Sequence, residues 1–189
     1  MRPGIPLLRC HVAAGHRQAG LSLIESCMAF LTLGILLAAA LPQFRQFQQR
    51  QQLQGIARML YTDLQEARSQ AVLGAGAVHL RISQHPQGSC YILHTGKAGD
   101  CACSDQGQAV CAQAEQLIKL QWLPPSRGFS SLQANVGQMS FQPRQGSVTS
   151  TGSIDIVGAD QQSISHIVSI AGRVRSCAPA APVGGLPPC

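Results

Sequence analysis

Apolar residues follow two patterns in the first part of the chain, and both patterns indicate a helix. Positions 21–41 are almost continuously apolar, which matches the roughly 20 residues that a helix needs to cross a bilayer. After a glutamine-rich stretch, apolar residues recur at helical spacing and form one stripe, which predicts an amphipathic continuation over 42–73. The stripe consists of Leu53, Ile56, Ala57, Leu60, Leu64, Ala67 and Ala71. We expect Asp63, Glu66 and Arg68 on the solvated face of this helix.

The pattern changes to short alternating runs after residue 74, which is typical of strands. The region 96–113 contains three cysteines and no clear period, so we predict a loop there. The head at 74–189 is therefore β-rich, and about 145 residues outside the membrane are enough for one compact domain. The predicted fold class is α+β, with the long helix packed on a mostly antiparallel sheet. The expected strands cover 78–82, 91–94, 118–122, 139–141, 153–157 and 164–170.

A single carboxylate, Glu25, interrupts the apolar segment near its start. An ionised side chain deep in a membrane helix costs up to about 3 kcal/mol on insertion scales. A residue that is this unfavourable needs a compensating role, so we interpret Glu25 as functional.

The residues around Glu25 resemble the processing signature of type IV prepilins and of the pseudopilins of type II secretion systems. A short basic leader ends at Gly20 and is followed by Leu21, Ser22, Leu23, Ile24 and Glu25. The resemblance implies that prepilin peptidase removes the leader 1–20 by cutting between Gly20 and Leu21, and that the new amine of Leu21 is methylated. It also implies that Glu25 neutralises such an amine during assembly, which removes the isolated buried charge.

The same resemblance implies a single-pass protein of the inner membrane with its head in the periplasm, which then enters a pilus or pseudopilus and reaches the cell surface in the pilus case. Pro42 matches a position where pilin helices commonly kink. The alternative is an ordinary secretory signal peptide that is cut near the small residues at 38–40.

The cysteines of the head form an even set. Cys10 lies in the leader and Cys27 in the apolar helix. An even set outside the inner membrane favours disulfides, and their pairing is open except that Cys177 and Cys189 bracket a tail rich in proline and glycine. A metal site is the alternative for the cluster at 101–111, but its spacing fits no common zinc pattern. The disulfide candidates are Cys90, Cys101, Cys103, Cys111, Cys177 and Cys189.

Three later blocks of the chain, at 63–72, 141–146 and 167–175, resemble the GspH/FimT class of minor pilins and pseudopilins. The last block contains Gly172, Arg173, Val174 and Arg175 directly after an apolar strand. If the strand continues, the two arginines point the same way.

Arginine pairs of this kind suit the phosphates of a nucleic-acid backbone and carry no sequence information. Members of the FimT branch with this pattern are associated with DNA capture in natural transformation. The resemblance therefore implies a minor type IV pilin that binds double-stranded DNA nonspecifically through Gly172, Arg173 and Arg175, with Arg144 and Arg127 as further candidates.

Net charge alone does not indicate a nucleic-acid partner. The formal charge is +6, but three of the fourteen basic residues lie in the leader, which leaves eleven against eight acids. The alternative is therefore a structural minor pseudopilin of a type II secretion system, or an assembly-priming minor pilin, whose partners are other major and minor pilins or pseudopilins. In that case Arg173 and Arg175 pair with acids such as Asp155 or Asp160, or contact another subunit.

An enzyme is the least favoured class. His79, His85, His94 and His166 are dispersed, and we find no nucleophile elbow, phosphate loop or zinc-protease helix. We therefore expect no catalytic residue, no cofactor and no metal.

Overall fold

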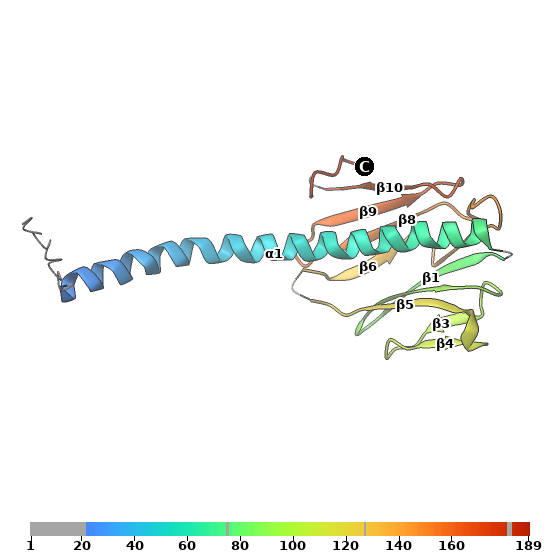
Figure 1. The fold of residues 1–189 in the computed structure, drawn as a ribbon, viewed down its shortest axis with the longest axis horizontal. Coiled ribbons are helices and arrows are strands. Elements are labelled where there is room, and N and C mark those ends of the chain that lie inside the picture. The colour runs from blue at the N-terminus through green and yellow to red at the C-terminus, as the bar shows by residue number, and fades with distance from the viewer. Residues whose placement is uncertain (1–21, 75, 127, 181–182) are drawn as a thin grey trace, which may run out of the picture. The chain divides into compact units, whose positions relative to one another are not determined.

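The structure, a computed structural model, describes residues 22–74, 76–126, 128–180 and 183–189. The chain divides into two units, one that ends at Pro42 and one that comprises Gln43–Cys189. Helix α1, Leu23–Leu73, begins in the first unit and ends in the second (Figure 1).

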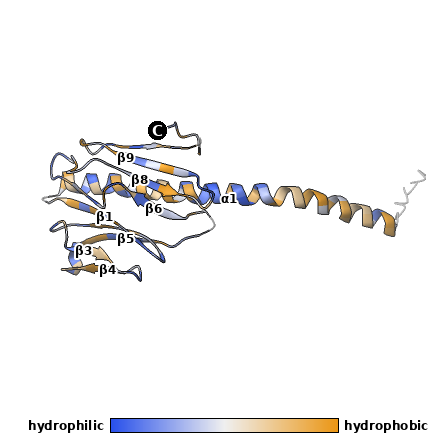
Figure 2. Ribbon diagram, turned by 180° about the vertical axis from the view of Figure 1, so that it is seen from behind, coloured by the Kyte–Doolittle hydropathy of each residue, from blue (hydrophilic) through white to orange (hydrophobic). Residues whose placement is uncertain are grey.

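The part of α1 before Pro42 is long and apolar enough to cross a membrane. Its large hydrophobic side chains, from Leu23 to Leu41, are exposed, and Figure 2 shows this part of the helix coloured mostly as hydrophobic. A helix that is apolar all round needs an apolar surrounding, which a bilayer or a bundle of similar helices supplies. Pro42 lies inside the helix, and the helical assignment continues through it.

The second unit contains two four-stranded sheets and a small ribbon, and all their strand pairs are antiparallel. The first sheet has the order β5-β2-β1-β7, the second has the order β10-β9-β8-β6, and β3 pairs with β4. The bounds are β1 Val78–His85, β2 Gly88–His94, β3 Cys101–Cys103, β4 Ala109–Cys111, β5 Leu117–Leu123, β6 Ser131–Ala134, β7 Gln138–Phe141, β8 Gly152–Val157, β9 Ser163–Val168 and β10 Val174–Cys177. A 3-10 turn, η1 Ala114–Gln116, precedes β5.

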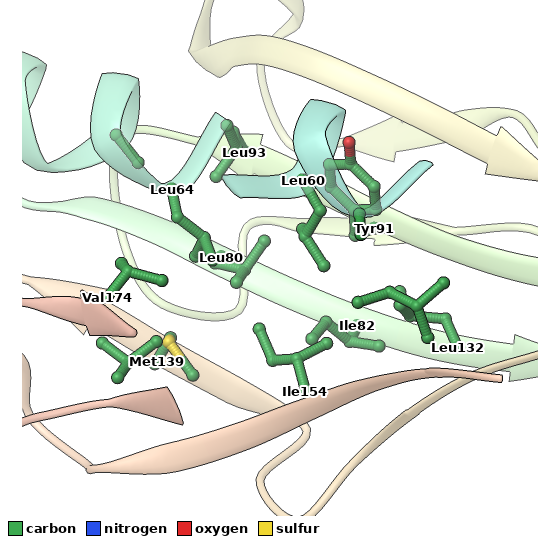
Figure 3. Close-up of a cluster of buried hydrophobic side chains, with 14 of the residues drawn as sticks. Leu60, Leu64, Leu80, Ile82, Tyr91, Leu93, Leu132, Met139, Ile154 and Val174 are labelled. Carbon is green, nitrogen blue, oxygen red and sulfur yellow. The ribbon is translucent and has the colours of Figure 1, made fainter. Parts of the chain in front are cut away.

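One hydrophobic core joins α1 to both sheets. The predicted stripe faces it, because Leu53, Leu60 and Leu64 are buried there against strands of the two sheets. Figure 3 shows Leu60 and Leu64 of α1 above Leu80 and Ile82 of β1, with Ile154 of β8 on the far side. The predicted α+β class, a long helix on antiparallel strands, is confirmed.

The six predicted strands match β1, β2, β5, β7, β8 and β9, but four further strands were not predicted. The region 96–113 is not only a loop, since it contains β3 and β4. Strand β9 ends at Val168, and the chain reverses into β10. The apolar strand therefore does not continue into the arginine motif, which was the condition for the two arginines to point the same way; Arg175 lies in β10 and Arg173 directly before it.

Candidate functional site

The amino-terminal end of α1 is a helix cap. The backbone N–H of Glu25 donates to the side-chain oxygen of Ser22 at 3.3 Å, and Glu25 lies in the first helical turn. A serine followed by glutamate three residues later is the pattern of a capping box, and a carboxylate there also opposes the helix dipole. The Ser22–Glu25 pattern thus has a local structural role. Gly20 and Leu21, where cleavage is predicted, lie outside the described residues.

The arginine motif follows a tight reversal between β9 and β10. The N–H of Gly172 donates to the carbonyl of Ser169 at 2.8 Å, and the N–H of Ser169 donates to the carbonyl of Arg173 at 3.0 Å. Arg173 closes this turn, and Arg175 follows in β10 opposite Ile167. Both arginine side chains are exposed, while Val174 between them is buried in the core.

Gly172 connects this turn to the loop that follows β7. Its φ angle is +69°, and a Cβ at this position would lie 1.9 Å from the carbonyl oxygen of Gly146. Only glycine tolerates both the backbone conformation and this contact. The same hypothetical Cβ would lie 3.1 Å from Nε of Arg68, which is buried and has no hydrogen-bond partner among the described residues.

The loop after β7 brings Arg144 to the same end of the unit. Arg144 has a φ angle of 67°, and its backbone N–H donates to the carbonyl of Ala71 in the last turn of α1 at 3.2 Å. Arg144 is exposed and lies two residues before Gly146, which packs against Gly172 of the arginine motif. Arg127, the other candidate, lies outside the described residues.

The acids that were the expected partners of these arginines bind elsewhere. Asp155 accepts a hydrogen bond from the hydroxyl of Ser165, and Asp160 accepts one from the backbone of Gln162. Among the described residues, Asp105 lies 2.7 Å from Nδ1 of His85, and Asp63 forms an ion pair with Lys119. Arg173 and Arg175 therefore form no ion pair with an acid among the described residues.

A family model described as "Type II transport protein GspH" matches residues 57–172, which is more than half of the chain. The chain belongs to the GspH family. The match covers the second part of α1 and most of the strands, and it ends at the glycine of the arginine motif.

Among solved structures, the GspH-family chain is similar to the minor pseudopilin EpsH from the type 2 secretion system of Vibrio cholerae. The two are 15% identical, the alignment covers 68% of this chain and 98% of EpsH, and the TM-score is 0.46. A comparison with curated proteins found no match.

A buried polar cluster joins α1 to the first sheet of the GspH-family chain. Asp63 is 2% exposed, accepts a hydrogen bond from the Tyr91 hydroxyl at 2.5 Å and lies 2.6 Å from Nζ of Lys119. Burial, and then the bond to Asp63, raise the pKa of Tyr91 well above its ordinary value. The prediction of a solvated face is therefore wrong for Asp63, while Glu66 is exposed as expected.

This cluster has a signal in the sequence that single-helix reasoning missed. Asp63 lies three residues after Leu60 and directly before Leu64, so helical spacing alone places it at the border of the apolar stripe. A charge at such a position requires a partner when it is buried. Lys119 and Tyr91 come from strands that are distant in sequence, which is why periodicity could not identify them.

Three of the histidines are packed inside the head. His79 and His94 face each other across β1 and β2 with ring centroids 5.1 Å apart, and Nε2 of His94 is buried with no hydrogen-bond partner among the described residues. His166 contacts the carbonyl of Ala57 through Nε2 at 2.8 Å and Oγ of Ser176 through Nδ1 at 2.9 Å. Burial lowers the pKa of His94 and of His166. Within the described ranges, no group of three or more His, Cys, Asp or Glu residues could hold a metal ion.

The six head cysteines form three disulfides. Cys177 is joined to Cys189, the pairing that the sequence favoured, and Val183 in the intervening tail is 2% exposed. Cys90 is joined to Cys103 and Cys101 to Cys111, which ties the β3-β4 ribbon to the first sheet. Cys90 and Cys101 are buried with Ile92 in a second hydrophobic cluster, separate from the main core.

Proposed function

We propose that this GspH-family chain is a minor filament subunit of a type II secretion system, anchored in the inner membrane before assembly. The family match over 57–172 is the observation that carries this proposal. The apolar part of α1 and the Gly20–Glu25 processing signature, which lies outside the matched region, support it independently. In this proposal prepilin peptidase cuts between Gly20 and Leu21, Leu21 is methylated, and other pseudopilins or pilins are the partners.

The proposed role of Glu25 follows from its position in the apolar part of α1. Glu25 is the sole acid from the start of the chain to Thr62, so no other carboxylate in this part of the chain can take over its role. A terminal ammonium at Leu21 of a neighbouring subunit supplies the opposite charge and offsets the cost of burying the Glu25 carboxylate in the filament. The helix dipole alone provides only about 0.3–1 kcal/mol to such a carboxylate.

Two substitutions at Glu25 separate capping from charge pairing. Glu25→Gln retains the capping-box pattern but removes the charge, whereas Glu25→Leu removes both. We expect both variants to be cleaved and to remain in the inner membrane, and both to be lost from sheared filament fractions in immunoblots. Normal incorporation of the glutamine variant would refute the role of the charge.

A second candidate function, DNA binding, is favoured by the exposed and acid-free arginines at one end of the head. Arg173, Arg175 and Arg144 would contact phosphates of duplex DNA without reading sequence, and the resemblance to the FimT branch motivates this idea. A small number of phosphate contacts gives weak binding that falls with rising salt, so several subunits would be needed for firm retention.

The DNA candidate is tested by gel shift of the full chain in detergent at increasing salt. We expect a shift at low salt that the double variant Arg173→Gln with Arg175→Gln loses. Arg45→Gln, which removes an arginine from α1 far from the motif in sequence, is the matched control and should leave the shift unchanged. If wild type gives no shift at low salt, the subunit has only the structural role.

A further inference from the structure

The segment 43–52 of α1 carries positive charge without any negative charge beside it. It lies between the apolar part of the helix and Leu53, the first buried residue of the stripe. Its two arginines, Arg45 and Arg50, are exposed, and neither forms an ion pair with an acid that the structure describes. The longer stretch 43–62 contains no acid at all. The segment is therefore suited to an anionic partner.

Two phenylalanines of the same segment lie on the side of α1 that the head does not cover. Phe44 and Phe47 are each 57% exposed, and their spacing of three residues places them on one face of the helix. Phe44 precedes the buried Leu53 by nine positions, which is roughly two and a half turns at 3.6 residues per turn. The two rings therefore point away from the hydrophobic core and form an exposed apolar patch.

The rings, one arginine and several glutamines share a single hollow on the surface of the helix. Phe44, Arg45 and Phe47 line this hollow of about 710 Å³. The rest of its lining consists of Gln48, Gln49, Gln51 and Gln52. The rings offer apolar contacts, the guanidinium offers a charge, and the amide groups offer uncharged hydrogen-bond donors. A ligand whose phosphate is joined to an apolar chain would use all three, whereas a free phosphate would not use the rings.

The position of the segment along α1 matches the surface of a bilayer. The exposed apolar part, from Leu23 to Leu41, is about 28 Å long at 1.5 Å per residue, close to the roughly 30 Å of a hydrocarbon core. Along the helix, Arg45 lies about 6 Å and Arg50 about 13 Å beyond Leu41. The headgroup layer is about 5 to 8 Å thick on each side. Arg45 therefore lies within this layer, and the long side chain of Arg50 can reach back to it.

We propose that Arg45 and Arg50, with Phe44 and Phe47, bind anionic phospholipids on the head side of the membrane before the subunit is assembled. The arginines contact lipid phosphates, and the rings lie at the level of the headgroups, where aromatic side chains are enriched in membrane proteins. One arginine at an anionic surface gives a preference of about fivefold for anionic over zwitterionic lipid. The inference rests on the proposed function, because it requires α1 to be anchored in the bilayer.

Quenching of a single tryptophan by neighbouring lipids tests the proposal. The full chain with Phe44→Trp and Trp122→Phe is reconstituted in phosphatidylcholine bilayers that contain brominated phosphatidylglycerol or brominated phosphatidylcholine as the quencher. We expect the phosphatidylglycerol to be favoured by fivefold or more at low salt, and the preference to fall as salt rises. The added substitutions Arg45→Gln and Arg50→Gln should remove most of the preference. Arg58→Gln, at an exposed arginine eight residues further along α1, is the matched control and should leave it unchanged.

Native mass spectrometry of the chain with its original phenylalanines and tryptophan gives a second measurement. We expect the detergent-purified chain to retain added phosphatidylglycerol more than phosphatidylcholine. The arginine double variant should lose this retention, and the variant with Phe44→Ala and Phe47→Ala should weaken it. Equal quenching and equal retention of the two lipids would overturn the inference.

Failure of this inference is distinguishable from failure of the proposed function. A chain that keeps its apolar helix and enters filaments, but shows no preference for phosphatidylglycerol, refutes only the lipid site. A mature chain that begins beyond Leu41 has no membrane helix and refutes the proposed function.

Discussion

Gly172 lies so close to Gly146 that the turn between β9 and β10 packs directly against the loop after β7. A Cβ on Gly172 would lie 1.9 Å from the carbonyl oxygen of Gly146. The backbone conformation and this contact together explain the glycine of the motif, so within the motif only Arg173 and Arg175 remain available for a ligand.

Substitution of Gly172 by alanine is expected to destabilise the head. The new methyl group meets a backbone oxygen at a positive φ, and we expect a loss of about 2 to 3 kcal/mol in the free energy of unfolding. Chemical denaturation of the full chain in detergent measures this loss. Gly99→Ala, where nothing lies within 4 Å of the added Cβ, is the control and should change stability by less than about 0.5 kcal/mol. Equal effects of the two substitutions would contradict the contact.

Removal of the Asp63 carboxylate should loosen α1 from the first sheet. Asp63→Ala leaves the buried Tyr91 hydroxyl without its acceptor, which costs up to about 3 kcal/mol, while the Lys119 ammonium, whose side chain is 36% exposed, can be solvated by water. Tyr91→Phe removes only one hydrogen bond and should cost about 1 kcal/mol. Glu66→Ala, an exposed acid of the same helix, should be nearly neutral. Denaturation curves that rank these three variants differently would show that the cluster does not stabilise the docking of α1.

The buried histidines predict a loss of stability in mild acid. Burial lowers the folded-state pKa of His94 and His166 below the ordinary value of 6.5. The unfolded chain then binds more protons than the folded chain, so their contribution to stability is complete above pH 6.5 and declines as the pH falls below it. The free energy of unfolding, measured between pH 5 and 8, should fall on the acidic side. His94→Gln should flatten the curve, and a curve that rises toward acid would contradict this assignment.

The Cys177–Cys189 bridge should hold the C-terminal tail on the core. It spans 12 residues, and loss of a loop constraint of this size costs about 3 kcal/mol. We expect the variant with Cys177→Ser and Cys189→Ser to be less stable and to be cut by protease within the tail. Cys27→Ser, at the free cysteine of α1, is the control. A tail that resists protease equally in both proteins would mean that packing of Val183 suffices without the bridge.

Periodicity predicted the elements whose pattern is local. The apolar stripe from Leu53 to Ala71 and the alternation in β8 follow from one face of each element being buried, so their types could be read from the sequence. Strands β3 and β4 were missed because each has three residues, too few to establish a period, and because their inward positions are cysteines. Strand β10 was missed because the turn at 169–173 reverses the chain within five residues.

The candidate site was less predictable than the fold, because its contacts join residues that are distant in sequence. The motif Gly172–Arg175 was found by resemblance, but its contact with Gly146 depends on how two loops meet. Asp63 was misplaced because a charged helical residue is usually exposed, and its partners Tyr91 and Lys119 lie 28 and 56 residues away.

The most direct measurement is the intact mass and amino-terminal sequence of the protein isolated from native membranes and filaments. If the chain is an assembled filament subunit, its first residue is Leu21, its amine is methylated, and the apolar helix with Glu25 is retained. A mature protein that begins beyond Leu41 would have lost this helix to signal peptidase, and that result would contradict the account.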